Sequence, residues 1–367
     1  MPRLRLIVTA ALLATLPAAA APRHGIAFHY ATPLSAQQLE WYSRFEVLVT
    51  HDPLPRAQAD ALRRAGTKLA LYEWSVAYYE ALKTPWHTRL PSSALLNATP
   101  LRGHLGAADA DAYYYDPATR EHMRDRAVML ARRLRAVGYD GVFFDTTTSA
   151  SVHPDALREY ERRHPELPYD AAFARFLTTL RQEMRGGIII TNQGYRAAND
   201  VLPYTDWDVT ESLITWPRGG HFVLRPWNDS ADAWNSTNFL MRHLIAPVRA
   251  RYPRVRYAHI NYLDAPEPRR VAEIVAISLL FDAHPVIATR DAATTIPSEL
   301  LLLDLGRPGA LHDAYRFFEH GFVAYNALPA PLRVPSEAVY EDAVTHERVT
   351  GTIVVPPRAA RILRRIR

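Results

Sequence analysis

The chain has 367 residues, of which 48% are hydrophobic and 22% charged, proportions usual for a globular protein. Its net charge of +5 comes from scattered residues without a basic block, so we expect no nucleic-acid partner. The absence of cysteine excludes disulfides, lipid attachment through cysteine and thiolate metal sites.

The first 21 residues have the pattern of a secretory signal peptide. Arg3 and Arg5 precede an apolar run over residues 6–16, and alanines at 18–21 offer small residues for cleavage. The apolar run is too short for a membrane-spanning helix. We therefore predict a secreted or periplasmic protein without stable membrane insertion.

Short runs of β-branched and aromatic residues then alternate with helical patterns, which indicates βα units and a parallel sheet. The clearest helical stripe lies over residues 121–137 and ends at Gly138, and two more helices are predicted around 173–184 and 270–281. The number and spacing of the strands predict a (β/α)8 TIM barrel over residues 22–312. The eight predicted strands are residues 25–30, 45–50, 68–73, 141–145, 187–191, 207–211, 256–261 and 285–289.

Two connections are much longer than the usual βα loop. The first, residues 78–120, contains Trp86 and His87 and is either a lid over the site or a subdomain with its own aromatic core. The second, residues 215–254, contains Trp216, Trp227 and Trp234. These rings either stack on sugars or belong to the core.

The pattern changes near residue 313 to short alternating strands. They are predicted at 315–318, 321–326, 332–335, 346–349 and 352–355. We interpret residues 313–367 as a small C-terminal antiparallel β domain.

Two acidic residues each close an apolar strand. Asp145 ends the run 139–145, and Glu211 ends the run 207–211. In a (β/α)8 barrel the carboxyl ends of the strands converge on the active face. A charge beside such a run is costly to bury unpaired, so it is exposed, hydrogen-bonded or functional. The structural alternatives are a helix or turn cap for Asp145 and an ion pair with arginine for Glu211.

Glycoside hydrolysis needs at least two carboxyl groups, one as the nucleophile and the other as the acid/base. Asp145 is the better candidate for the nucleophile because hydroxyl residues follow it, and the longer Glu211 suits the acid/base; the reverse assignment stays open. Polar and aromatic residues at or beyond the other strand ends are predicted to bind the substrate. They are His29, Tyr30, Glu73, Trp74, Asn192, Gln193, Trp216, Asn261 and Tyr262.

Other chemistries lack their motifs. The first strand ends in a single histidine rather than His-x-His, and the histidines elsewhere have no metal-ligand spacing. The sequence contains neither a Gly-x-Gly-x-x-Gly nor a phosphate loop, and no Gly-x-Ser-x-Gly elbow. We therefore predict an enzyme that uses neither a metal nor a cofactor.

Three motifs resemble the endo-α-1,4-polygalactosaminidase-like glycoside hydrolases, which are secreted (β/α)8 enzymes. These are Tyr-Asp-Gly-Val-Phe-Phe-Asp at 139–145, Thr-Asn-Gln-Gly at 191–194 and Val-Thr-Glu-Ser-Leu at 209–213. The resemblance implies Asp145 and Glu211 as the catalytic pair, a retaining mechanism, and an amino-sugar exopolysaccharide as a possible substrate. The end of the third strand and the long insertion after it depart from the family pattern. The alternatives to a glycoside hydrolase are a non-catalytic polysaccharide-binding barrel and an exopolysaccharide assembly factor.

Overall fold

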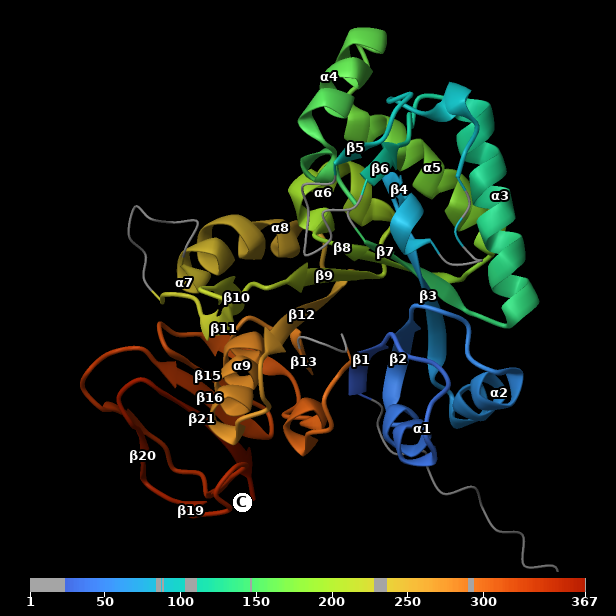
Figure 1. The fold of residues 1–367 in the computed structure, drawn as a ribbon. Coiled ribbons are helices and arrows are strands. Elements are labelled where there is room, and N and C mark those ends of the chain that lie inside the picture. Colours follow the sequence, from blue (N-terminus) through green and yellow to red (C-terminus); the bar gives the residue numbers. More distant parts are fainter. Residues whose placement is uncertain are drawn as a thin grey trace, which may run out of the picture.

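A computed structural model describes residues 24–83, 87, 89–102, 111–145, 147–227, 236–289 and 294–366 (Figure 1). The predicted signal peptide lies outside the described residues, as do Trp86 and Trp234. Within the described ranges, no helix is both long and apolar enough to cross a membrane.

Eight parallel strands form the central sheet and confirm the predicted (β/α)8 barrel. Each predicted strand is present: three have the predicted bounds, and the other five are shifted by one or two residues at one or both ends. The sheet order is β1-β2-β3-β7-β8-β9-β12-β13. The bounds are β1 His24–His29, β2 Phe45–Thr50, β3 Lys68–Trp74, β7 Gly141–Asp145, β8 Ile188–Asn192, β9 Trp207–Glu211, β12 Arg256–Leu263 and β13 His284–Thr289.

The barrel closes between β13 and β1 through a short segment rather than a direct ladder. The Thr295 N–H donates to the Phe28 carbonyl at 2.8 Å, and the Thr295 hydroxyl oxygen accepts from the Phe28 N–H at 2.8 Å. On the other side, the Ile296 N–H donates to the Ile287 carbonyl at 2.9 Å. This segment therefore satisfies backbone groups on both strands that would otherwise be left unpaired at the seam.

Glycine is required at the start of β1. Gly25 has φ of +32°, and a Cβ built on it would lie 2.1 Å from the His284 ring. The close packing of this buried ring against the backbone leaves no room for a side chain.

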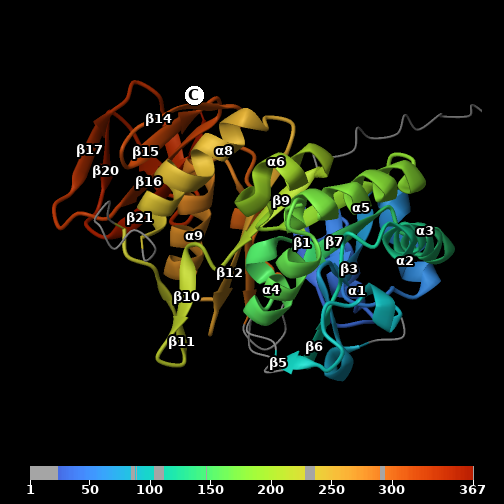
Figure 2. The ribbon, with the colours of Figure 1, turned by 90° about the horizontal axis from the view of Figure 1, so that it is seen from above.

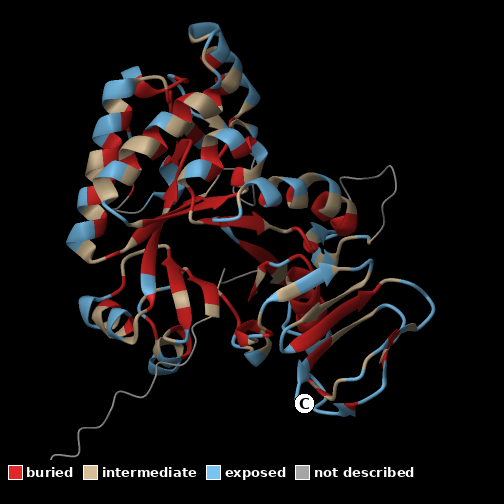
Figure 3. Ribbon diagram, turned by 180° about the vertical axis from the view of Figure 1, so that it is seen from behind, coloured by how far each residue is buried: buried red, intermediate tan, exposed pale blue. Residues whose placement is uncertain are grey.

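Both faces of the barrel strands are buried, as Figure 3 shows. The inner face carries an apolar cluster that includes Ile26, Phe28, Phe143, Ile190 and Val209. The outer face packs against the helices. Because successive side chains of a strand point to opposite faces, only every second residue at a strand end enters the barrel.

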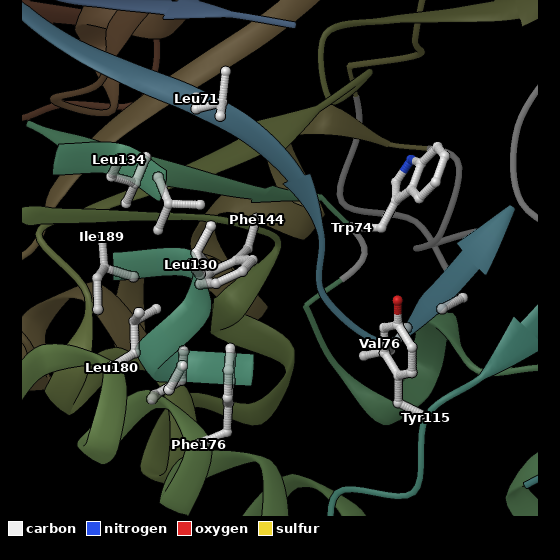
Figure 4. Close-up of a cluster of buried hydrophobic side chains, with 14 of the residues drawn as sticks. Leu71, Trp74, Val76, Tyr115, Leu130, Leu134, Phe144, Phe176, Leu180 and Ile189 are labelled. Atoms are coloured by element: carbon white, nitrogen blue, oxygen red, sulfur yellow. The ribbon is translucent and has the colours of Figure 1, made fainter. Parts of the chain in front are cut away.

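Helices cover the outer face. Figure 4 shows Phe144 of β7 and Ile189 of β8 packed against Leu130 and Leu134 of α3 and against Phe176 and Leu180 of α5. The helices are α1 Ala36–Tyr42, α2 Arg56–Ala65, α3 Arg120–Val137, α4 Pro154–Arg163, α5 Tyr169–Met184, α6 Ala198–Val201, α7 Thr237–Phe239, α8 Ala246–Arg251 and α9 Pro268–Leu280. A π-helical turn over Leu240–Ile245 joins α7 to α8.

The long connections form structure of their own. The connection after β3 builds a small sheet from β4 Ala77–Tyr79, β5 Leu101–Arg102 and β6 Asp111–Tyr114, with 3-10 turns at Glu80–Leu82 and Ser92–Ala94. The connection after β9 begins with an antiparallel hairpin of β10 Thr215–Arg218 and β11 His221–Leu224.

The C-terminal part is an antiparallel β structure beside the barrel (Figure 2). It contains a six-stranded sheet and a two-stranded one, and helix α9 packs against strands β16 and β21. The strands are β14 Pro308–Leu311, β15 Tyr315–Phe318, β16 Gly321–Asn326, β17 Leu332–Pro335, β18 Tyr340–Asp342, β19 Arg348–Val349, β20 Thr352–Val355 and β21 Ala359–Arg365. The sequence prediction missed β14, β18 and β21, and the sheet already begins at Pro308, before the predicted boundary at 313.

Candidate active site

Six side chains that point into the barrel meet at its carboxyl end. We call them the mouth layer: Tyr30 after β1, Tyr72 on β3, Asp145 on β7, Asn192 on β8, Glu211 on β9 and Tyr262 on β12. Their neighbours two residues earlier, such as Phe28, Phe143 and Val209, belong to the inner apolar cluster. The layer therefore lies directly above that cluster, at the end where barrel enzymes carry their chemistry.

A single amide links the two predicted catalytic carboxyl groups. Asn192 Nδ2 donates to Asp145 Oδ1 at 2.8 Å and to Glu211 Oε2 at 2.8 Å. The two carboxylate oxygens consequently lie no further apart than twice 2.8 Å. Both protons of this amide are used, and the Asn192 side chain is only 6% exposed.

Each carboxyl group receives a further hydrogen bond from a tyrosine. The Tyr72 hydroxyl donates to Asp145 Oδ2 at 2.6 Å, and the Tyr262 hydroxyl donates to Glu211 Oε1 at 2.8 Å. Burial, followed by the nearby carboxylate charges, raises the pKa of both phenols well above 10. The two tyrosines are therefore protonated donors at any physiological pH.

The environment distinguishes Glu211 from an ordinary glutamate. Burial and then the neighbouring Asp145 charge raise the pKa of Glu211, while hydrogen bonds from Tyr262 and Asn192 oppose the rise. The balance favours the protonated form, because removing a carboxylate from water penalises its charge more than the two donors compensate.

Aromatic rings line the layer on the Asp145 side. The Tyr30 ring lies 5.5 Å from the Tyr72 ring, and the His51 ring lies 5.0 Å from Tyr72 and 5.8 Å from Tyr30. Tyr72 was not among the predicted binding residues, whereas His51 follows the second strand, where the sequence predicts a polar group that binds sugar hydroxyls. Tyr72 lies two positions before Trp74 and therefore points to the same face of the strand. This alternation in the sequence could have indicated Tyr72 as a residue of the site.

Three predicted binding residues do not enter the mouth layer because their strand parity is opposite. His29 is 2% exposed and its Nδ1 lies 3.2 Å from the Tyr42 hydroxyl outside the barrel. Glu73 lies 3.6 Å from Arg126 of α3, and burial raises the pKa of Glu73 to about 7. Asn261 accepts hydrogen bonds from the Ile214 and Thr215 N–H groups. The last contact shapes the start of the hairpin, whereas the first two stabilise the packing of helices.

The other three predicted residues, Trp74, Gln193 and Trp216, are not among the six side chains of the mouth layer. Trp74 is 3% exposed and stacks on His87 with ring centroids 3.8 Å apart. Gln193 has φ of +58° and begins the loop after β8. Trp216 lies on β10, with the Arg225 guanidinium 4.6 Å from its ring centroid.

Among the described residues, no group of three or more histidine, aspartate or glutamate side chains has the geometry of a metal site.

Neither a family model nor a curated protein matches the sequence. Solved structures do. The glycoside hydrolase domain of PelA from Pseudomonas aeruginosa matches with a TM-score of 0.52 at 22% identity, over 72% of this chain and 94% of that domain. Amy13B from Eubacterium rectale matches with a TM-score of 0.54 at 8% identity, over 93% of this chain and 95% of its own. The α-amylase from Malbranchea cinnamomea reaches 0.50 at 9% identity, over 94% and 96%. The chain therefore has the (β/α)8 fold that these glycoside hydrolases share.

Proposed function

We propose that the chain is an exported glycoside hydrolase that cleaves a polysaccharide with Asp145 and Glu211. The observation that supports this function best is the Asn192 amide shared between the two carboxyl groups. The two carboxyl groups thus lie side by side in the mouth layer, and both residues are part exposed. The PelA domain, with a similar fold, is itself a glycoside hydrolase domain.

The spacing supports a retaining mechanism. Carboxyl groups about 5–5.5 Å apart are typical of retaining glycosidases, whereas inverting enzymes need about 6.5–9.5 Å to admit a water molecule. An upper limit of twice 2.8 Å between the two hydrogen-bonded oxygens agrees with the retaining class.

The hydrogen bonds suggest the role of each group. Asp145 receives donors on both oxygens, which stabilise the ionised form required of a nucleophile. Glu211 has a raised pKa, which suits a group that first donates a proton. An Asp145 oxygen attacks the anomeric carbon while Glu211 protonates the departing glycosidic oxygen. Glu211 then takes a proton from water, which attacks the glycosyl-enzyme and releases Asp145.

The charge of the site favours a neutral or cationic sugar. The six side chains of the mouth layer include two carboxyl groups and no cationic group. A uronic acid would meet like charge there, whereas an amino sugar would meet opposite charge. This supports the amino-sugar exopolysaccharide suggested by the resemblance.

The test is reducing-end release from bacterial exopolysaccharides that include galactosamine and glucosamine polymers, each with and without N-acetyl groups. We expect Asp145→Asn and Glu211→Gln each to lose activity by roughly a thousandfold or more, since each carries a separate step. Glu161→Gln, on the exposed face of α4, is the matched control. Proton NMR of the first product gives the anomeric outcome.

Activity that survives both substitutions would place the chemistry elsewhere. If no polymer is cleaved but one is bound, the non-catalytic polysaccharide-binding barrel is the better description.

A further inference from the structure

The β10–β11 hairpin projects from the barrel, as Figure 2 shows, and its first strand begins four residues after Glu211. It pairs Thr215 with Leu224, Trp216 with Val223 and Pro217 with Phe222. Gly219 and Gly220 form its tip with positive φ angles, and neither would bring a Cβ within 4 Å of another group. The hairpin therefore extends the rim of the site without being buried in the barrel.

The pairing decides which side chains share a face of the hairpin. Side chains directly opposite each other lie on the same face, and faces alternate along each strand. Phe222 and Pro217 consequently share one face with Thr215, while Trp216 and Val223 occupy the other. The predicted sugar-binding ring, Trp216, thus points to the opposite side from Phe222.

The face with Phe222 adjoins the mouth layer. The Thr215 hydroxyl donates to the Tyr262 carbonyl at 2.9 Å, which brings this face against the end of β12. The Phe222 ring centroid lies 5.3 Å from that of Tyr262, with the planes inclined by 34°. Because the Tyr262 hydroxyl bonds to Glu211, one ring separates Phe222 from the proposed acid/base.

Backbone contacts hold Phe222 in this place. Its N–H donates to Asp264 Oδ2 at 3.0 Å, just beyond the end of β12. The same carboxylate oxygen lies 3.2 Å from Nδ1 of His221. The position of the ring is therefore fixed both by the ladder of the hairpin and by the segment that carries Tyr262.

We infer that Phe222, with Pro217 beside it, is the binding platform for the sugar on the leaving-group side of the cleaved bond. This inference rests on the proposed function. Along the sheet the order is β7 with Asp145, β8 with Asn192, β9 with Glu211 and β12 with Tyr262, and the hairpin packs against β12 through the rings of Phe222 and Tyr262. The group that protonates the departing oxygen faces the departing sugar, so that sugar lies on the side of Glu211 away from Asp145.

The chemistry of the platform suits this task. Phe222 is part exposed and Pro217 is exposed, so both have surface left to cover. The C–H face of a sugar ring is apolar, and burying it against an aromatic ring removes apolar surface from water without requiring a hydrogen bond. Such a platform accepts a long polymer without selecting a single sugar.

The test compares Phe222→Ala with Val223→Ala, a change on the opposite face of the same hairpin. One readout is kcat/KM on α-1,4-linked galactosamine oligosaccharides and on galactosaminyl fluoride, whose leaving group is a single atom. The other is calorimetric binding of the same oligosaccharides in a Glu211→Gln background, which needs no turnover. We expect Phe222→Ala to weaken binding and to lower kcat/KM on the oligosaccharides by about tenfold or more. Hydrolysis of the fluoride should stay within about twofold, and Val223→Ala should leave both substrates unaffected.

Equal losses on oligosaccharide and fluoride would overturn the inference, because the effect of Phe222 would then not depend on a sugar on the leaving-group side. Unchanged oligosaccharide affinity would overturn it as well. A wild-type protein that binds the oligosaccharide through Phe222 without cleaving it would refute the proposed hydrolase and leave the platform standing. Absence of binding to any oligosaccharide, even at millimolar concentration, would refute both.

Discussion

Replacing Asn192 by leucine removes the amide that donates a hydrogen bond to each of the two carboxyl groups. Leucine nearly keeps the side-chain volume and excludes water, so no new donor takes the place of the amide. Two hydrogen bonds of 2.8 Å are lost at once, one to Asp145 and one to Glu211. The acid and the nucleophile then face each other without a shared donor.

The magnitude follows from this geometry. The hydrogen bond to the protonated Glu211 contributes about 0.5–1.5 kcal/mol, as for neutral partners, and the one to the ionised Asp145 contributes more. A hydrogen bond to a charged group contributes roughly 1.5–3 kcal/mol. Because the two contributions overlap and the site is partly solvated, we expect a loss of about 2–4 kcal/mol in transition-state stabilisation. This corresponds to a fall in kcat/KM of roughly 30-fold to 1000-fold.

The pH dependence should change as well. The Asn192 hydrogen bond lowers the pKa of Glu211, so its removal raises that pKa. A general acid works only while protonated, and the alkaline limb of the kcat/KM profile should therefore move to higher pH.

The assay is the pH profile of polymer hydrolysis, with thermal unfolding to verify the fold. Asn199→Leu is the matched control, because Asn199 is exposed in the segment that follows β8. Activity of Asn192→Leu within about twofold of wild type, with an unmoved alkaline limb, would refute the reasoning.

Three further changes test other parts of the molecule. Tyr262→Phe removes a hydrogen bond that lowers the pKa of Glu211, so kcat/KM should fall by roughly tenfold and the alkaline limb should move to higher pH; a shift to lower pH would contradict this. Burial raises the pKa of Glu73 from its ordinary 4.5 to about 7, so folding takes up a proton between these two pH values. The free energy of unfolding therefore falls by up to about 3 kcal/mol as the pH rises through this range. Glu73→Gln should flatten that fall in urea unfolding between about pH 4.5 and 7 and keep catalytic activity. Gly25→Ala should lower the free energy of unfolding by about 2–4 kcal/mol, because a Cβ there meets a buried histidine ring at 2.1 Å. Gly219→Ala, in open space, should lower it by about 1–2 kcal/mol. Equal losses of the two variants in urea unfolding would contradict this.

The barrel could be predicted from local patterns. Its strands are apolar runs bounded by turns and helices, and this pattern survives without knowledge of any long-range contact. The same reading located Asp145 and Glu211, because a carboxylate at the end of an apolar run is conspicuous. Strand β21 was missed because its arginine-rich sequence, Ala359–Arg365, resembles an exposed tail. It becomes a strand by pairing with β16 and β18, which are distant in sequence.

Which strand-end residues face inward could not be predicted in the same way. A parallel barrel strand is buried on both faces, so its sequence shows little alternation of polar and apolar residues. Either alternate set of residues could therefore face the inside of the barrel. His29 and Glu73 were therefore predicted beside Tyr30 and Trp74, although one member of each pair has to face the helices.

The sequence by itself determined the order of βα units, the helix end at Gly138 and the two carboxyl groups at strand ends. The tertiary structure decided that one asparagine amide links those groups, that Tyr72 and Tyr262 donate to them, and that Phe222 rather than Trp216 adjoins Tyr262. These contacts join residues from different strands and from a hairpin. They depend on sheet order and strand parity, which arise only when the whole barrel closes.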